Sequence, residues 1–219
     1  MASDEVGPLL PPDGPLNATL IDWKPDARLH RVHDGAWGPA EFNRSRFGNA
    51  RFSPLFDNSG NIVPTLYAGT TLDCALMETI FHDVPYASGL KTVSKRSRIA
   101  GHLISRIQLE TKLTVIDLSA IALRKLGISR TDLLETEKDH YPASREWART
   151  LYSQYTQAQG LLWTSRQDDR SLACILFGDR IAAGSLASVA EPLPLLHPDG
   201  SACMEILTLA RRLNVEVVD

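Results

Sequence analysis

The sequence predicts an α+β fold built as one domain. Segments with strand-like and helix-like patterns follow one another without strict strand–helix–strand alternation, which is typical of this class. The chain has 219 residues, 43% of them hydrophobic and 22% charged, an ordinary globular composition in a chain long enough to bury a core. We find no internal repeat. We expect an extended, proline-rich tail over residues 1–20 and a single domain over residues 21–219.

Short apolar runs predict the strands. They cover residues 28–33, 62–68, 101–109, 112–117, 160–165 and 171–178. The first strand carries Arg31 between apolar positions. The second leads directly into a helix, and the strand over 160–165 ends in a hydroxyl at Ser165 and a cation at Arg166.

Helical spacing and capping residues predict the helices. They cover residues 70–82, 119–126, 131–137, 142–158 and 200–213. The first has apolar side chains at the spacing of one helix face, and Thr70 with Asp73 three residues later resembles a capping box. The second has Ser119 as its N-cap and Gly127 just past its end. The fourth carries an apolar stripe that includes Trp147.

Glu78 is the residue that the pattern singles out for chemistry. It lies in the helix predicted over 70–82, with Cys74 four residues before it and Phe81 three residues after it, the positions that touch it on a helix surface. In such a half-apolar environment a carboxylate costs free energy unless a donor or a cation is its partner. The candidate partners are Arg31, Arg51, Ser165 and Arg166.

Charge and cysteine content argue against several classes of function. The formal net charge is −3 and the pI about 6.1, so the protein lacks an overall basic surface for nucleic acid. The local basic run Lys91–Arg98 is interpreted as a solvated loop, with contact to a phosphate or an acidic partner as the alternative. Cys74, Cys174 and Cys203 have no close spacing, which favours free thiols in a reducing cytoplasm. No apolar run approaches the roughly 18 residues of a membrane span, and no secretory signal is found, so we expect a cytoplasmic protein without membrane contact.

Motifs for other kinds of site are missing from the sequence. There is no glycine-rich phosphate loop of the dinucleotide-binding or Walker type, and no pair of cysteines has zinc spacing. His30 and His33 are three residues apart, which places them on opposite faces of a strand. Ser165 lacks the Gly-x-Ser-x-Gly context of a serine hydrolase. We therefore expect no metal and no tightly bound cofactor.

Five fragments, taken in order, resemble the RES-domain family, which is named for its arginine, glutamate and serine. They are an arginine on the first strand, Arg-Phe-Ser-Pro, Leu-Tyr-Ala before a helix, Ala-Leu-Met-Glu inside it, and Gly-Leu-Leu-Trp-x-Ser-Arg late in the chain. The resemblance covers about residues 29–177. It implies an ADP-ribosyltransferase-like mixed β-sheet core around an NAD cleft, with a helical insertion at about 119–158.

The function implied by the resemblance is that of a toxin from a bacterial toxin–antitoxin pair. Such a protein would consume NAD+ by cleaving the nicotinamide–ribose bond, with water or phosphate as the acceptor. The alternatives are mono-ADP-ribosylation of a cellular protein and a catalytically inactive module that binds a nucleotide or a partner. The implied partners are NAD+, a cognate antitoxin with a helix-turn-helix DNA-binding part, and a protein acceptor of ADP-ribose. A nucleic-acid enzyme using residues 91–98 is disfavoured by the acidic pI.

The resemblance assigns charged roles to three residues. Glu78 would stabilise the positive charge that grows on the ribose as nicotinamide leaves. Arg31 and Arg51 would bind the two phosphates through their planar forks, and either would orient Glu78. The structural alternatives are an ion pair for Glu78, an arginine extending from a strand edge for Arg31, and a turn cap for Arg51.

The remaining candidates are aromatic or hydroxyl-bearing. Tyr67 would offer its ring to nicotinamide and its hydroxyl to the site, and Phe52 stands where many family members have tryptophan. Ser165 would hold Glu78, an arginine or the ribose, and Arg166 is a secondary candidate. The alternatives are a core aromatic for Tyr67 and an ordinary strand-end hydroxyl for Ser165. The chain is longer than compact members in the tail, the Val84–Arg98 loop and the insertion, which would shape a surface for an acceptor or an antitoxin.

Overall fold

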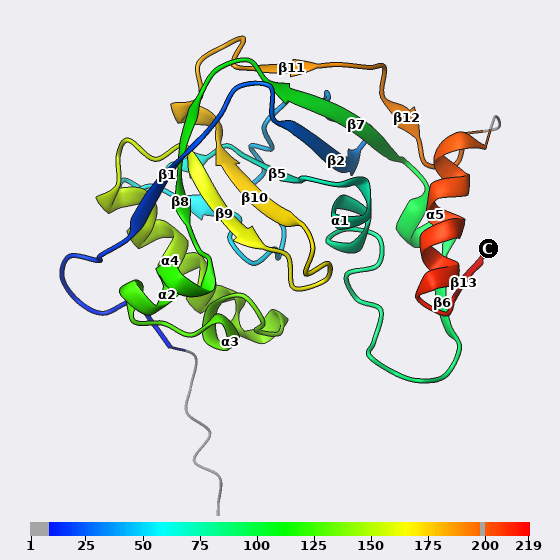
Figure 1. Cartoon of the computed structure of the whole chain (residues 1–219), viewed down its shortest axis with the longest axis horizontal. Helices are drawn as coiled ribbons and strands as arrows, with labels where there is room; N and C mark the ends of the chain where they lie inside the picture. Colours follow the sequence, from blue (N-terminus) through cyan, green and yellow to red (C-terminus); the bar gives the residue numbers. More distant parts are fainter. Residues whose placement is uncertain (1–8, 198–199) are drawn as a thin grey trace, which may run out of the picture.

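The centre of the protein is a mixed β-sheet. The structure, a computed structural model, describes residues 9–197 and 200–219. The sheet has the strand order β1-β8-β9-β10-β5-β2-β7-β11, with β12 also paired to β7 (Figure 1). Its strands are β1 (Thr19–Trp23), β2 (Arg28–Asp34), β5 (Thr65–Gly69), β7 (His102–Leu109), β8 (Leu113–Asp117), β9 (Gly160–Thr164), β10 (Leu172–Phe177), β11 (Leu186–Ser188) and β12 (Leu193–Pro194). Its described neighbours are antiparallel, with β8 and β9 parallel. The predicted α+β class is confirmed, and the likeness to ADP-ribosyltransferases stays a prediction.

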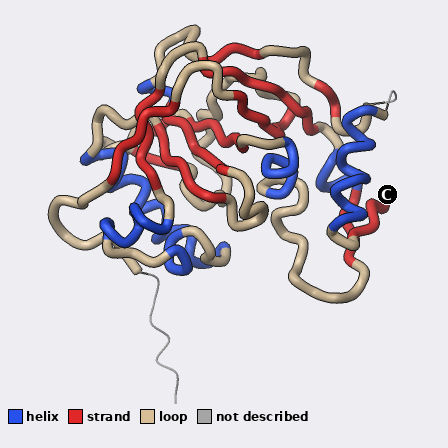
Figure 2. Tube along the Cα trace, in the orientation of Figure 1, coloured by secondary structure: helices blue, strands red, loops and turns tan. Residues whose placement is uncertain are grey.

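The helices gather at two ends of this sheet, as the blue segments of Figure 2 show. One group consists of α2 (Ala120–Leu126), α3 (Arg130–Leu133) and α4 (Tyr141–Gln154). The other consists of α1 (Leu72–Met77) and α5 (Ser201–Arg212), with the strands β6 (Lys91–Ser94) and β13 (Val215–Val218). Trp147 and Leu151 of α4 pack against Trp163 and Ile175 of the sheet, and α5 packs with α1 in a separate apolar cluster. The site described below lies between these two groups.

The predicted strands are confirmed with one change. Residues 62–68 were expected to form one strand, but the chain forms β4 (Ile62–Val63), then Pro64, then β5. Proline has no N–H for a ladder hydrogen bond, which accounts for the break. The short strand β4 pairs with β3 (Leu55–Phe56) in a separate two-stranded sheet.

Three of the predicted helices are clearly shorter than expected. The helix predicted over 142–158 is α4, which ends at Gln154. Helix α1 begins after Thr71, whose side chain accepts a hydrogen bond from the Cys74 N–H, and ends at Glu78. The Thr79 hydroxyl donates to the Ala75 carbonyl (2.8 Å), so this side chain competes with the backbone N–H that would continue the helix. Helix α3 spans only 130–133 instead of 131–137, and a 3-10 turn (Lys138–His140) then leads into α4. Helix α2 has the predicted caps, Ser119 and a left-handed Gly127.

Part of the predicted tail is packed. Residues 1–8 lie outside the described residues, but Leu16 and Ala18 are buried and β1 pairs with β8. The Leu16 N–H donates to the Gln154 side chain (2.7 Å), and the Ala18 N–H donates to the Tyr155 hydroxyl (2.7 Å). The contacts with α4 explain why this stretch does not behave as a loose tail.

The segment expected to be a loop before Arg98 contains regular structure. Strand β6 pairs in parallel with β13, more than a hundred residues away in sequence, and is followed by a π-helix (Lys95–Ile99). Ile99 is buried in the cluster that includes α5. In the described part of the chain no helix combines the length and apolar character needed to cross a membrane.

Candidate active site

A pocket of about 360 Å³ lies between the two helical groups. Its volume is in the range of small-molecule sites, which is about 300–1,000 Å³. The pocket is lined by residues from β2, β5, β9, β10, the end of α1, the loop before β3 and the turn before α4. They are Val32, Asn49, Ala50, Arg51, Tyr67, Ala68, Ala75, Glu78, Thr79, His82, Asp83, Arg98, Lys138, Tyr141, Trp163 and Ala173.

Glu78 and Ser165 meet at one end of this pocket, which we call the base. Glu78 is half-buried at the C-terminal end of α1, and Ser165 is fully buried just after β9. The Ser165 hydroxyl donates a hydrogen bond of 2.6 Å to Glu78 Oε1. Ser165 is therefore the donor that the environment of Glu78 required.

The backbone around Ser165 fixes the direction of this hydrogen bond. The N–H groups of Gln167 and Asp168 both donate to Ser165 Oγ at 3.0 Å. Because the oxygen accepts two hydrogen bonds, its single proton is directed toward Glu78. The carboxylate is thus held in one orientation, and within residues 9–197 and 200–219 no hydrogen bond engages its second oxygen.

Arg51 reaches the pocket from the loop before β3, but most of its fork is already bonded. Nη1 donates to the Leu133 carbonyl (3.2 Å) and the Thr136 hydroxyl (2.6 Å), and Nη2 donates to the Thr136 carbonyl (3.2 Å). The guanidinium also lies 4.9 Å from the centre of the Tyr141 ring. Burial lowers the pKa of Arg51, while the Glu78 carboxylate acts in the opposite direction. Arg51 joins the end of α3 and the segment after it to the base and supplies positive charge beside Glu78.

Aromatic side chains form one wall of the pocket. Tyr67 on β5 and Trp163 on β9 line the pocket, with ring centres 6.4 Å apart. The Tyr67 hydroxyl accepts a hydrogen bond of 3.0 Å from the Phe52 N–H, and burial raises the pKa of Tyr67 to about 12. Phe52 itself is fully buried against Trp163 and does not line the pocket. Phe52 therefore supports the wall from behind.

The structure does not bring Arg31 to this pocket. Its neighbour Val32 lines the pocket, and successive side chains of a strand point to opposite faces, so Arg31 points to the other face of the sheet. There Arg31 Nη1 donates to the carbonyls of Gly38, Pro39 and Glu41 at 2.8–2.9 Å. Burial lowers the pKa of Arg31 to about 10, so it stays charged at neutral pH. Its contacts organise the loop after β2.

Arg166 lies beside the pocket without lining it. Its Nη1 donates to the carbonyls of Glu135 and Thr136, both at 2.9 Å, and its Nη2 pairs with Glu137 at 2.9 Å. Arg166 and Arg51 therefore both bind the segment after α3 and hold it against the sheet.

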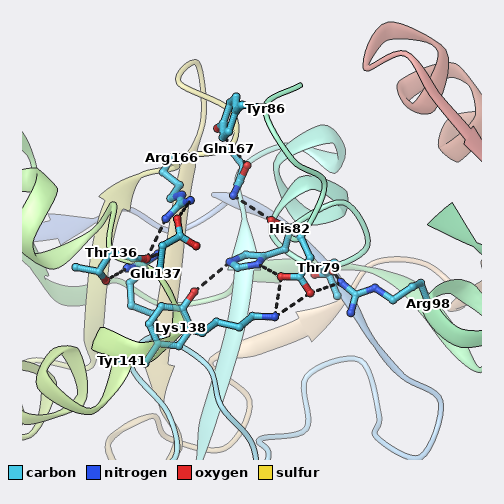
Figure 3. A network of polar contacts seen from close by, with 12 residues as sticks. Thr79, His82, Tyr86, Arg98, Thr136, Glu137, Lys138, Tyr141, Arg166 and Gln167 are labelled. Atoms are coloured by element: carbon cyan, nitrogen blue, oxygen red, sulfur yellow. Dashed lines mark hydrogen bonds and ion pairs between the residues drawn. The ribbon is translucent and has the colours of Figure 1, made fainter. Parts of the chain in front are cut away.

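A second part of the pocket lining, which we call the mouth, carries a network of charged side chains (Figure 3). Asp83 accepts from Lys138 Nζ (2.7 Å), from Arg98 Nη2 (3.1 Å) and from the His82 ring (2.8 Å). The other ring nitrogen of His82 lies 3.3 Å from the Tyr141 hydroxyl. Burial acts to raise the pKa of Asp83, but the hydrogen bonds from Lys138 and His82 and the charge of Arg98 outweigh it and hold the pKa at about 2.

Sequence reasoning missed the residues of the mouth. In the sequence Arg98 stands out only as part of a basic run, and Lys138 and Asp83 belong to segments with no recognisable motif. The one available signal was the alternative that the run over 91–98 meets a phosphate.

The described residues give little support for a metal site or for a cysteine nucleophile. No group of three or more histidine, cysteine or carboxylate side chains in residues 9–197 and 200–219 is placed to hold a metal ion. Cys74 is buried near Glu78, and burial raises the pKa of its thiol to about 12, so it is protonated at neutral pH and a poor nucleophile. The base instead offers a fixed carboxylate beside aromatic rings, which can stabilise a positive charge on a bound ligand.

Comparison with known proteins adds a family to this geometry. A family model described as RES domain matches residues 28–197, which include the base and the mouth. No curated protein matches the chain.

Proposed function

Because the chain belongs to the RES-domain family, we propose that it consumes NAD+ by cleaving the bond between nicotinamide and ribose. Membership of this family is consistent with a toxin-like, NAD-related function. The finer proposal is that of a toxin in a toxin–antitoxin pair, acting in the cytoplasm, with NAD+ as substrate and no tightly bound cofactor. A cognate antitoxin with a helix-turn-helix part would bind over the pocket.

The observation that carries this proposal is the Glu78 carboxylate held by Ser165 at 2.6 Å inside a pocket of ligand size. When nicotinamide leaves, its ring nitrogen takes the electron pair of the C1′–N bond and becomes neutral, and positive charge develops on the ribose. A carboxylate fixed next to that sugar stabilises the transition state more than the ground state. An immobile carboxylate is suited to this task, since it does not have to reorient as the charge forms.

The walls of the pocket suit the leaving group. Tyr67, Tyr141 and Trp163 provide aromatic surface in the same cavity as Glu78. Nicotinamide is a flat, cationic ring in NAD+, and aromatic faces attract such rings. The acceptor oxygen of water or phosphate then bonds to C1′, and its proton is lost to solvent.

The proposal is tested with NAD+ labelled separately in the nicotinamide and in the adenine. The pure protein is incubated with each label in buffer, in buffer with phosphate, and with cell extract. Release of nicotinamide with the adenine label in a small molecule supports NAD+ degradation. Transfer of the adenine label to a protein band would instead identify mono-ADP-ribosylation, and no release of nicotinamide under any condition would overturn both activities.

A further inference from the structure

Two cations line the mouth of the pocket and remain accessible there. Lys138 lies in the turn before α4 and Arg98 in the π-helix after β6, so distant parts of the sequence meet at this point. Their side chains are 50% and 39% exposed. Two exposed cations side by side in the lining of a cavity that also holds Glu78 are placed to meet the charged part of a ligand.

Asp83 holds both cations at the same edge. Lys138 Nζ lies 2.7 Å from Asp83 Oδ1 and 2.8 Å from Asp83 Oδ2, and Arg98 Nη2 lies 3.1 Å from Oδ2. One carboxylate between two cations leaves one net positive charge at this edge. An ammonium has three N–H donors and a guanidinium five. Within the described residues, Lys138 donates only to Asp83, and Arg98 donates only through Nη2, so both keep donors for a ligand.

The arginines that the family resemblance assigned to phosphate are less available. Both N–H groups of Arg51 Nη1 are used by Leu133 and Thr136, and Nη2 also donates to Thr136. Arg31 points to the other face of the sheet. Arg51 is only 9% exposed and has fewer remaining donors than Arg98, so the two exposed cations of the mouth are the more accessible partners for a pair of phosphates.

We propose that Lys138 and Arg98 form a phosphate clamp for the pyrophosphate of a dinucleotide, with Asp83 as their positioning residue. The proposal deepens the proposed function and rests on it. With the reacting ribose at Glu78, the pyrophosphate of the same ligand extends toward the mouth, where the clamp bonds its non-bridging oxygens. The basic run over 91–98 thus contributes one specific residue, Arg98.

Binding measurements separate the clamp from the rest of the pocket. The probes are ADP-ribose, which carries the pyrophosphate, and nicotinamide riboside, which has the nicotinamide and ribose but no phosphate. Calorimetry compares the wild type with Lys138→Ala, Arg98→Ala and the double variant. We expect each single change to weaken ADP-ribose binding about tenfold, as for the loss of a charged hydrogen bond, with a larger loss in the double variant. Binding of nicotinamide riboside stays unchanged.

Matched controls remove exposed cations that also pair with a carboxylate. Lys112→Ala breaks the pair with Asp22, and Arg149→Ala breaks the pair with Glu146, both away from the pocket. These variants should bind ADP-ribose like the wild type. Asp83→Asn should weaken ADP-ribose binding and leave nicotinamide riboside binding intact, a split that a general loss of structure would not produce.

The outcomes distinguish failure of the clamp from failure of the proposed function. If the wild type binds ADP-ribose and the double variant binds it equally well, the clamp is overturned and the proposed function stands. Equal weakening for both probes also overturns the clamp, because the role of the cations is then structural. If the wild type releases no nicotinamide but binds ADP-ribose through Lys138 and Arg98, the clamp stands without the reaction. A wild type that binds neither probe overturns both.

Discussion

The carboxylates at the base and at the mouth of the pocket are held in place by different kinds of interaction. At the base, Glu78 is held by a fully buried Ser165, whose hydroxyl also accepts from two backbone N–H groups. At the mouth, Asp83 forms ion pairs with Arg98 and Lys138, which are 39% and 50% exposed, and a hydrogen bond with His82. Buried hydrogen bonds are costly to leave unmade, whereas exposed ion pairs contribute little to stability and are screened by salt. The base is therefore suited to hold a catalytic carboxylate in a fixed position. At the mouth, the cations paired with Asp83 can form new contacts with a ligand.

The largest expected effect comes from Glu78→Gln at the base. The change keeps the size of the side chain but removes the charge, and loss of one such electrostatic group costs about 10²–10³ in rate. Nicotinamide release, measured by chromatography, should fall by this factor while the melting temperature changes little. The control is Glu146→Gln, which alters a surface glutamate paired with Arg149. A folded Glu78→Gln protein with wild-type turnover would rule out this role for the carboxylate.

The second largest effect concerns a residue that belongs to neither end. Arg31→Ala leaves the carbonyls of Gly38, Pro39 and Glu41 without their shared donor. Hydrogen bonds to charged groups contribute about 1.5–3 kcal/mol, so we expect the free energy of unfolding to drop by that amount. Denaturant unfolding measures the loss, and calorimetry on the folded variant should show the wild-type affinity for ADP-ribose. If the variant had the stability of the wild type but bound ADP-ribose more weakly, Arg31 would instead be assigned to binding of the phosphates.

Ser165→Ala tests whether the base depends on its supporting hydroxyl. The change removes the donor to Glu78 and the acceptor of the Gln167 and Asp168 N–H groups. Unmade buried hydrogen bonds cost about 1–3 kcal/mol, and we expect a loss of stability near the lower end of this range. Turnover should fall with it, because Glu78 loses its fixed orientation. Ser153→Ala, which removes an exposed hydroxyl bonded to Asn58, is the control. Unaltered turnover would show that Glu78 needs no support from Ser165.

The smallest effect is a pH dependence at the mouth. The pKa of Asp83 is held at about 2, below its ordinary value, so its contribution to stability is present above pH of about 4 and lost as pH falls toward 2. Because the side chain is 41% exposed, we expect less than about 1 kcal/mol. The free energies of unfolding of the wild type and Asp83→Asn, measured at low salt, should differ at pH 6 and converge near pH 2. Asp169→Asn, at an 88% exposed carboxylate, serves as control. A difference that grows at low pH would contradict the assignment.

The sequence was informative about the base because its signals are local. The apolar stripe beside Glu78 and the strand that ends at Ser165 are each visible within a dozen residues. Their meeting needs only that the helix after β5 lies next to β10 and β9, which the sheet order provides. The strand that carries Arg31 is predicted from the sequence. Successive side chains of a strand point to opposite faces of the sheet, and only the tertiary structure decides which face is turned toward the pocket.

The residues of the mouth could not be predicted from the sequence, because contacts between distant segments of the chain bring them together. Asp83, Arg98 and Lys138 come from three separate segments of the sequence, and none has a periodic pattern that assigns it to a site. The position of Arg98 depends on pairing between β6 and β13, and parallel pairing over such a sequence distance leaves no short-range mark. Likewise, Leu16 is buried by contacts with α4, and the proline-rich sequence around Leu16 gives no indication of these contacts.

The pairing of β6 with β13 links the mouth to a distant part of the chain. These strands form a two-stranded sheet of their own, beside the π-helix that carries Arg98, and Val93 and Val215 share one apolar cluster with α5. Small sheets of this kind open locally at lower free energy than a central sheet. Local opening of this unit would displace the π-helix that follows β6 and, with it, Arg98. Occupancy by a dinucleotide would then slow amide hydrogen exchange in residues 215–218, although these residues do not line the pocket.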